Sequence, residues 1–300
     1  MDLGNLKGIL VPIITPININ EDVDEKGFRK LLNHCVEKGI QSIFVGGTNG
    51  ETMALTQKQR NNAIKIALDE VGSKVPIVCG VMDSSTRRVI ENIKEVEHMG
   101  GEIVAVTPVF YAVNKYQGEI LTHFREISKN TKLSILAYNI PPYTGVNIEP
   151  DVVFQLAEIK NVIGYKDSSG SMINFQKYIH YFKGSDFKLF IGKSELAGIS
   201  ILMGADGYVP GLAPVFHSLY LELYNSAVEK NIEKTLKLSE LVCNSLKLLS
   251  LAKNSLSATK YAISLLGFTS KQVIKPFESL TEEQEVKIKH IVENTINKKY

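Results

Sequence analysis

The chain has 300 residues, of which 44% are hydrophobic and 22% charged, so it can bury a large core and has no bias typical of disordered, collagenous or coiled-coil proteins. Its 34 basic and 32 acidic residues leave a formal net charge of +2, which gives no electrostatic basis for a nucleic-acid partner. Three widely spaced cysteines predict neither a disulfide framework nor a zinc site. With no signal-peptide pattern and no apolar run of membrane-spanning length, we expect a cytoplasmic protein without a membrane partner.

Short apolar stretches of strand length alternate with stretches of helical periodicity over about two-thirds of the chain. The first strand is predicted over residues 8–15 and the first helix over 24–39; a strand over 42–47 and a helix over 56–71 follow. In the second helix a glutamine lies three residues after Thr56, the pattern of a capping box. The remaining strands are predicted over residues 75–80, 103–107, 133–138, 162–166, 187–191 and 207–209, with helical segments between them.

This alternation predicts an α/β fold. The eight strands recur at intervals of roughly 20 to 35 residues, which is the length of one βα unit. Their continuous Val, Ile and Leu runs suit a parallel sheet covered on both faces. The strand count favours a (β/α)₈ TIM barrel over an open doubly wound sheet, which has the same alternation. Beyond about residue 225 the pattern indicates successive helices at 232–252, 256–266 and 281–297, so we predict a barrel domain, 1–224, and a C-terminal helical domain, 225–300.

One lysine lies at the end of a strand that is predicted to be buried. Lys166 belongs to the sequence G-Y-K-D-S-S-G and follows the apolar residues Val162 and Ile163. Burial disfavours the charged amine, lowers its pKa and frees a lone pair for attack on a carbonyl group. The local sequence is equally compatible with a lysine that extends into solvent or pairs with Asp167.

Two other strand ends carry candidate functional groups, and a barrel would bring all of them to one mouth. The second strand ends in G-G-T-N-G-E, residues 46–51, a glycine-rich turn whose N–H groups could bind a carboxylate. The alternative for this segment is an ordinary βα turn. Tyr138 ends the fifth strand, so it should neighbour Lys166, where a phenol could transfer protons or serve only as a packed aromatic residue.

In combination these segments resemble a known family. The G-x-T-N-G-E turn, the Y-N-I-P-x-x-T-G segment beginning at Tyr138 and the G-Y-K-D-S-S-G segment, in this order and spacing, resemble the N-acetylneuraminate lyase and dihydrodipicolinate synthase superfamily of pyruvate-type class I aldolases. The resemblance extends from residue 8 to the C-terminal helices. It implies a (β/α)₈ barrel with a C-terminal helical domain, no metal or organic cofactor, and a homotetramer built from two dimers.

The resemblance also implies roles for individual residues. Lys166 would form a covalent Schiff base with a 2-keto acid, Tyr138 would act as general acid and base, and Thr48 would relay protons to Tyr138. The backbone amides of Thr48 and Asn49 would hold the carboxylate of the keto acid. The implied substrate-binding residues all lie at strand ends: Gly47, Thr48, Asn49, Tyr143, Ser168, Gly192, Glu195 and Val209.

Two departures from the family pattern concern the second substrate and the proton relay. Tyr143 stands where synthase members carry an arginine that binds the carboxylate of the second substrate, and the loss of a bidentate donor argues against dihydrodipicolinate synthesis. Phe110 stands where family members usually have a tyrosine that joins the relay across a dimer. Tyr111 is therefore the candidate replacement for that relay tyrosine.

Another departure concerns sialic acid lyases, which use an acidic pair after the strand-seven glycine and a serine after strand eight. Here Gly192 is followed by Lys193, Ser194 and Glu195, so only one acidic residue remains, and Gly211 stands at the place of the serine. A 2-keto-3-deoxy sugar acid shorter than sialic acid is the better candidate.

We therefore expect a Schiff-base aldolase that cleaves or forms a 2-keto-3-deoxy sugar acid, or a related 4-hydroxy-2-keto acid, with pyruvate as the keto-acid partner. The same residues could run 4-hydroxy-tetrahydrodipicolinate synthesis, N-acetylneuraminate cleavage or a dehydratase reaction. An alternative of another class is a catalytically silent family member that binds keto acids, because fold does not fix function.

Overall fold

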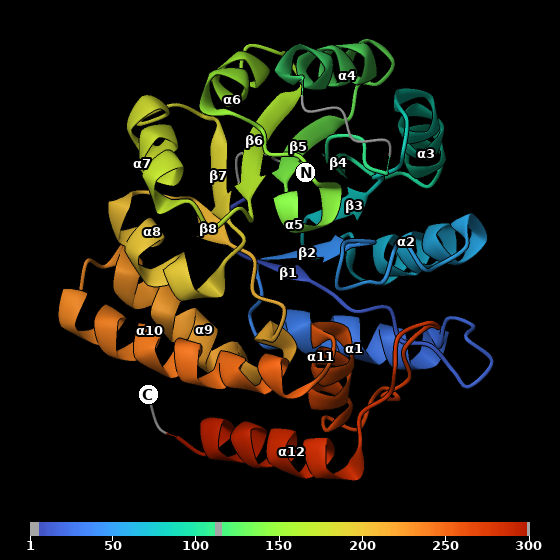
Figure 1. The fold of residues 1–300 in the computed structure, drawn as a ribbon, viewed down its shortest axis with the longest axis vertical. Coiled ribbons are helices and arrows are strands. Elements are labelled where there is room, and N and C mark those ends of the chain that lie inside the picture. The colour runs from blue at the N-terminus through green and yellow to red at the C-terminus, as the bar shows by residue number, and fades with distance from the viewer. Residues whose placement is uncertain (1–5, 112–115, 299–300) are drawn as a thin grey trace.

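The computed structural model of the chain describes residues 6–111 and 116–298. Within them, parallel strands pair in chain order and close into a barrel, since the last strand pairs with the first (Figure 1). This closure confirms the (β/α)₈ barrel and excludes the open sheet. The strands are β1 (Gly8–Pro12), β2 (Ser42–Val45), β3 (Ile77–Gly80), β4 (Ile103–Val106), β5 (Ser134–Asn139), β6 (Val162–Asp167), β7 (Lys188–Ile191) and β8 (Gly207–Tyr208).

Helices connect the strands and form an outer layer (Figure 1). The capping box predicted for α2 is present: the side chain of Thr56 accepts from the N–H of Gln59, and the side chain of Gln59 accepts from the N–H of Thr56. The connecting helices are α1 (Glu25–Glu37), α2 (Gln57–Val71), α3 (Thr86–His98), α4 (Gln117–Lys129), α5 (Pro141–Thr144), α6 (Pro150–Leu156), α7 (Met172–Tyr181), the 3₁₀ helix η2 (Ser194–Leu196), α8 (Ala197–Met203) and α9 (Ala213–Val228).

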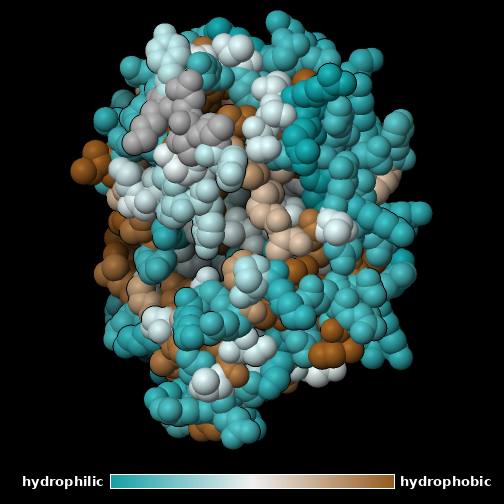
Figure 2. Space-filling model, turned by 45° about the vertical axis from the view of Figure 1, so that its right-hand side comes forward, coloured by the Kyte–Doolittle hydropathy of each residue, from teal (hydrophilic) through white to brown (hydrophobic). Residues whose placement is uncertain are grey.

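The strands bury both faces, which explains their continuous apolar runs. Alternate residues such as Leu10, Phe44 and Leu136 point into the barrel and form a small inner core. Their neighbours in sequence pack outward against the helices in a much larger core. Hydrophilic residues dominate the face in Figure 2, where hydrophobic ones lie in small separate groups.

Several strands are shorter than predicted, among them β2, which ends at Val45 although the prediction extended to residue 47. For β1 and β3 the structure gives a cause. β1 ends at Pro12 although the apolar run continues to Thr15, and Thr15 uses its hydroxyl to bond the carbonyl of Gly50. β3 begins only at Ile77, after Pro76, which has no N–H to donate to a neighbouring strand. Local hydrogen bonding therefore sets these ends, while apolar patterning sets the strand centres.

The C-terminal helices are α10 (Ile232–Leu246), the 3₁₀ helix η3 (Lys247–Leu251), α11 (Ser255–Ser264) and α12 (Glu282–Ile296). They gather on one side of the barrel (Figure 1). The prediction of one helix over 232–252 was wrong in that α10 ends at Leu246 and changes to 3₁₀ geometry. α9 runs across the predicted boundary between residues 224 and 225 and contacts α1, β1 and α10, so the division into 1–224 and 225–300 stays a prediction.

No helix in the described part of the chain is long and apolar enough to cross a membrane.

Candidate active site

Lys166 and Tyr138 are paired neighbours on adjacent strands, as the βα spacing predicted. The Lys166 side chain is only 3% exposed, and its Nζ lies 3.7 Å from the ring centroid of Tyr138 and 4.7 Å from that of Phe44. Burial lowers the pKa of the Lys166 amine to about 7. A large share of this amine is therefore neutral at neutral pH and able to act as a nucleophile.

The alternatives left open for Lys166 do not fit the structure. Its burial excludes a side chain that extends into solvent. Asp167 points to the other side of β6, where one carboxylate oxygen accepts from Asn139 Nδ2 and the Ser169 N–H, both at 2.9 Å, and the other from Ser169 Oγ, also at 2.9 Å. The carboxylate next in sequence is therefore held by other partners, and the amine faces the inside of the barrel.

Tyr138 is a buried phenol whose hydroxyl interacts with two others. Burial raises the pKa of Tyr138 to about 12, while hydrogen bonding with the hydroxyls of Thr48 and Ser168 acts in the opposite direction. The phenol is thus protonated at neutral pH and connected to Thr48, the residue expected to relay protons.

The turn after β2 has the form expected of an anion site. The N–H of Gly50 donates to the carbonyl of Gly47 (3.0 Å), and the N–H of Glu51 to that of Thr48 (3.1 Å). Among the described residues no carbonyl accepts from the N–H groups of Thr48 or Asn49, which leaves both at the tip of the turn for an anion. Gly47 lies against Phe44, and a Cβ there would meet the ring at 3.0 Å.

A cavity of about 550 Å³ opens at the carboxyl ends of the strands and brings most of the predicted residues together. Gly47 does not line it. A Cβ at Gly192 would lie 2.0 Å from Ser168 Oγ, so a side chain there would displace the Ser168 hydroxyl. The predicted residues in the wall are Thr48, Asn49, Tyr138, Tyr143, Lys166, Ser168, Gly192, Glu195 and Val209.

A second, mostly apolar cavity of about 170 Å³ adjoins the first and shares Thr48, Tyr138 and Tyr143 with it. Phe110 lines this smaller cavity. Tyr111 lines neither and is 95% exposed, with a left-handed φ of 78°, directly before residues 112–115, which lie outside the described part of the chain. Within one chain Tyr111 therefore does not reach Tyr138, and a relay from a neighbouring copy stays a prediction.

Sequence reasoning missed Phe44, which packs beside Lys166 inside the barrel, and several residues of the cavity wall. Phe44 could have been found from strand alternation, which places it inside the barrel next to Lys166. Residues of the C-terminal segment had no local signal, because only tertiary packing brings them to the mouth: Leu246, Leu249, Ser255 and Thr259. Within the described residues, no group of three or more His, Cys, Asp or Glu side chains is placed to hold a metal ion.

The fold and the site together define an enzyme of the class I aldolase type, a carbon–carbon lyase. The chain belongs to the dihydrodipicolinate synthetase family, whose sequence model matches residues 5–295. This confirms the family that the motifs predicted and makes the protein a pyruvate-dependent lyase.

Individual relatives match over nearly their whole length. The chain is 28% identical to a 4-hydroxy-tetrahydrodipicolinate synthase of Kosmotoga olearia over 291 residues, which is 96% of this chain and 98% of the relative. Among solved structures, the dihydrodipicolinate synthase of Bacteroides thetaiotaomicron is 31% identical with a TM-score of 0.91, covering 96% of this chain and 98% of that one. The chloride inhibited synthase of Acinetobacter baumannii, complexed with pyruvate, is 26% identical with a TM-score of 0.91, covering 97% and 99%.

Proposed function

We propose that the enzyme forms and breaks a carbon–carbon bond next to the carbonyl of pyruvate through a Schiff base on Lys166. The observation that carries this proposal is the buried amine, with its pKa near 7, at the base of a strand-end cavity. Its lone pair attacks C2 of pyruvate, and loss of water gives an iminium ion. The iminium withdraws electrons from C3, so loss of a C3 proton leaves an enamine instead of a free carbanion.

Tyr138, Thr48 and the turn after β2 supply the other functions. In the synthetic direction the enamine carbon attacks an aldehyde, the aldehyde oxygen takes a proton through Tyr138 and Thr48, and water hydrolyses the new iminium to release the amine. In cleavage the same steps run in reverse. The free N–H groups of Thr48 and Asn49 bind the carboxylate and so orient the carbonyl toward Lys166.

For the second substrate, the comparisons favour synthesis of 4-hydroxy-tetrahydrodipicolinate over the sugar-acid reaction expected from the sequence. The Kosmotoga relative and one from Archaeoglobus fulgidus, 28% identical over 288 residues, both carry that name. Removing the carbons of pyruvate from that product leaves a four-carbon amino aldehyde with its own carboxylate, aspartate β-semialdehyde. We propose this aldehyde as the first candidate.

A 2-keto-3-deoxy sugar acid is the second candidate, and Tyr143 is the observation that favours it. Tyr143 is 63% exposed at the rim shared by the two cavities. A phenol there offers one hydroxyl to a hydroxyl-rich substrate but lacks the forked donors that bind a carboxylate. Lys193, Ser194 and Glu195 line the same cavity and add further polar groups.

Trapping with borohydride tests the Schiff base. Borohydride added with pyruvate should inactivate the protein and leave a reduced adduct on Lys166, which peptide mass spectrometry locates. Lys166→Arg should abolish labelling, because a guanidinium stays protonated and cannot attack. An adduct on another lysine, or no adduct on the wild-type protein, would contradict a Schiff base on Lys166. A catalytically silent protein that binds keto acids would then explain the site better.

A paired assay distinguishes the two substrates. Aspartate β-semialdehyde with pyruvate should be consumed if the first candidate is right, and Tyr143→Arg should then raise kcat/KM by supplying a carboxylate partner. If the second is right, a panel of 2-keto-3-deoxy sugar acids should release pyruvate, and the same substitution should lower kcat/KM. Tyr143→Phe is the matched control, since it removes only the hydroxyl.

We also propose that the enzyme assembles as a homotetramer, or at least a dimer. Tyr111 and Met53 are exposed by 95% and 56%, and Met53 lines the small apolar cavity next to Tyr138. A neighbouring copy that covers this region would remove apolar surface from water.

A further inference from the structure

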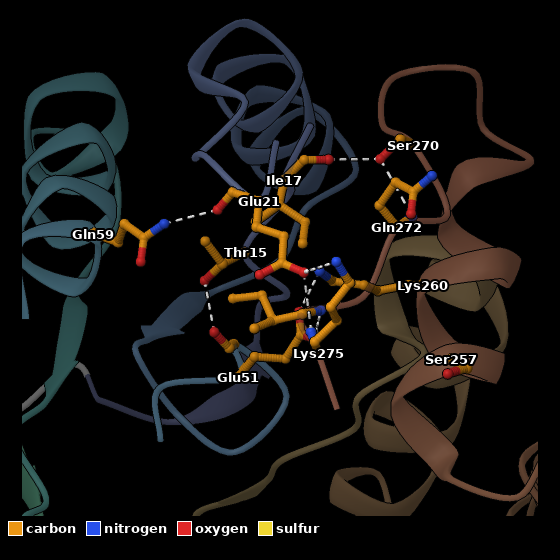
Figure 3. Close-up of polar contacts among 12 residues, drawn as sticks. Thr15, Ile17, Glu21, Glu51, Gln59, Ser257, Lys260, Ser270, Gln272 and Lys275 are labelled. Atoms are coloured by element: carbon orange, nitrogen blue, oxygen red, sulfur yellow. Dashed lines mark hydrogen bonds and ion pairs between the residues drawn. The ribbon is translucent and has the colours of Figure 1, made fainter. Parts of the chain in front are cut away.

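A buried ion pair joins the turn after β2 to the C-terminal helices. Glu51 ends the turn and pairs with Lys260 of α11, and the side chains of both are fully buried. Figure 3 shows Glu51, Thr15 and Lys260 approaching one another from three parts of the chain. Neither charged residue belongs to the reaction described above.

The backbone of Glu51 helps to define the turn. Its N–H bonds the carbonyl of Thr48, and its own carbonyl accepts from the N–H groups of Ala54 (2.8 Å) and Leu55 (3.1 Å). Glu51 has a left-handed φ of 54°, which a residue with a side chain adopts only when its surroundings hold it there. The placement of Glu51 therefore determines where Thr48 and Asn49 lie.

Three anchors from outside the turn hold this backbone in place. The Thr15 hydroxyl donates to the carbonyl of Gly50 at 2.9 Å. The Ile274 N–H donates to Glu51 Oε1 at 3.0 Å, and the Lys260 ammonium pairs with Glu51 Oε2. Two of the three therefore come from the segment that follows the barrel.

The helix that carries Lys260 also forms part of the substrate cavity. Ser255 and Thr259 of α11 line that cavity, and Leu256 lines the smaller one. The ion pair thus ties a wall of the cavity to the turn that faces Lys166.

A buried ion pair adds little net stability, because removing both charges from water costs about as much free energy as their attraction contributes. Burial lowers the pKa of Lys260, and the charge of Glu51 opposes this effect. The attraction between the two charges therefore offsets part of the cost of removing the Lys260 ammonium from water. Replacing both partners of such a pair by uncharged residues of similar size is often neutral for stability, whereas removing one partner leaves a buried charge alone. The pair is therefore better explained by the geometry it fixes than by the stability it adds.

We propose that Glu51 and Lys260 are positioning residues for keto-acid binding. They hold the N–H groups of Thr48 and Asn49 toward the carboxylate and the Thr48 hydroxyl toward Tyr138, so that α11 takes part in building the active site. This inference rests on the proposed function, since it assigns the turn to the carboxylate of pyruvate.

The test compares Glu51→Gln, Lys260→Met and the double variant. Glu51→Gln keeps an oxygen for the Ile274 N–H, and Lys260→Met keeps the length of the side chain. Each single variant should lower the melting temperature, because one charge remains buried without its partner. The double variant should regain the wild-type melting temperature but retain a KM for pyruvate raised about 10- to 100-fold, the effect of a small displacement of binding groups.

Lys188→Met is the matched control. It breaks an ion pair with Asp206 (3.5 Å) at the start of β7, the end of the barrel away from the cavity, so it should leave the KM for pyruvate unchanged. If the double variant regains both the melting temperature and the wild-type KM, the pair is only structural and the proposal is overturned.

Hydrogen exchange separates failure of this inference from failure of the proposed function. The amides of Gly50 and Glu51 should exchange about tenfold faster in the double variant than in the wild type, with the strand amides unchanged. Faster exchange supports the positioning role of the pair even if the wild type forms no imine with pyruvate, which would contradict the proposed function alone. Unchanged exchange overturns the positioning role whatever the imine assay gives.

Discussion

Replacing Lys166 by methionine should stabilise the folded protein, and the gain should depend on pH. The amine is 3% exposed between two aromatic rings, and burial lowers its pKa from 10.5 to about 7. The folded state therefore binds this proton less readily than the unfolded chain does. The proposed function thus depends on a group that weakens the fold.

The effect of the Lys166 amine on the free energy of unfolding follows from the linkage between protonation and folding. Above pH 10.5 the amine is neutral in both states and contributes nothing. As the pH falls toward 7, only the unfolded state gains the proton, so wild-type stability is lost progressively and the loss is complete below about pH 7. The gap between 10.5 and about 7 corresponds to about 5 kcal/mol at about 1.36 kcal/mol per pKa unit.

Urea unfolding at pH 6 and pH 9 measures the effect. Lys166→Met should raise the free energy of unfolding by about 5 kcal/mol at pH 6 but only by about 2 kcal/mol at pH 9. The gain is smaller at pH 9 because this pH lies closer to the pKa of the amine in the unfolded chain, so protonation stabilises the unfolded chain less. Lys65→Met, on the exposed face of α2, controls for the loss of one lysine. An equal gain at both pH values would refute the reasoning, because it would show that the buried amine does not titrate between them.

Further predictions address the reaction and the assembly. The rate of borohydride trapping with pyruvate should rise about tenfold per pH unit up to about pH 7 and then level off as the neutral amine becomes the major form; a flat profile would contradict a limiting amine. Tyr138→Phe should lower kcat by about 100- to 10,000-fold while imine formation with pyruvate changes far less, because proton transfer is lost and the carboxylate contacts remain. Lys193→Ala should raise the KM for substrates with an anionic or hydroxyl-rich far end and leave that for pyruvate unchanged, and identical kinetics across the panel would remove Lys193 from the site. Light scattering should give a tetramer or dimer, since Tyr111 is 95% exposed in one chain, whereas a monomer at assay concentration would exclude any relay from a partner.

The sequence by itself determined the barrel and the centre of the site. Alternating apolar strands and amphipathic helices are local patterns, so periodicity alone predicted the repeated βα units. Tyr138 and Lys166 lie one unit apart at the ends of parallel strands, and parallel pairing places such residues side by side. The capping box at Thr56 was likewise a local signal that the structure confirms.

Tertiary structure alone decided what completes the site. The end of β1 at Pro12 depends on a partner that only the fold supplies, the Gly50 carbonyl to which Thr15 donates. The change of α10 to a 3₁₀ helix after Leu246 has no signal in the sequence pattern. Thr259 reaches the cavity, and Lys260 reaches Glu51, only because α11 packs against the mouth of the barrel. No periodicity or spacing links residues so far apart in the chain, since such contacts come from the packing of whole elements and leave no local pattern in the sequence.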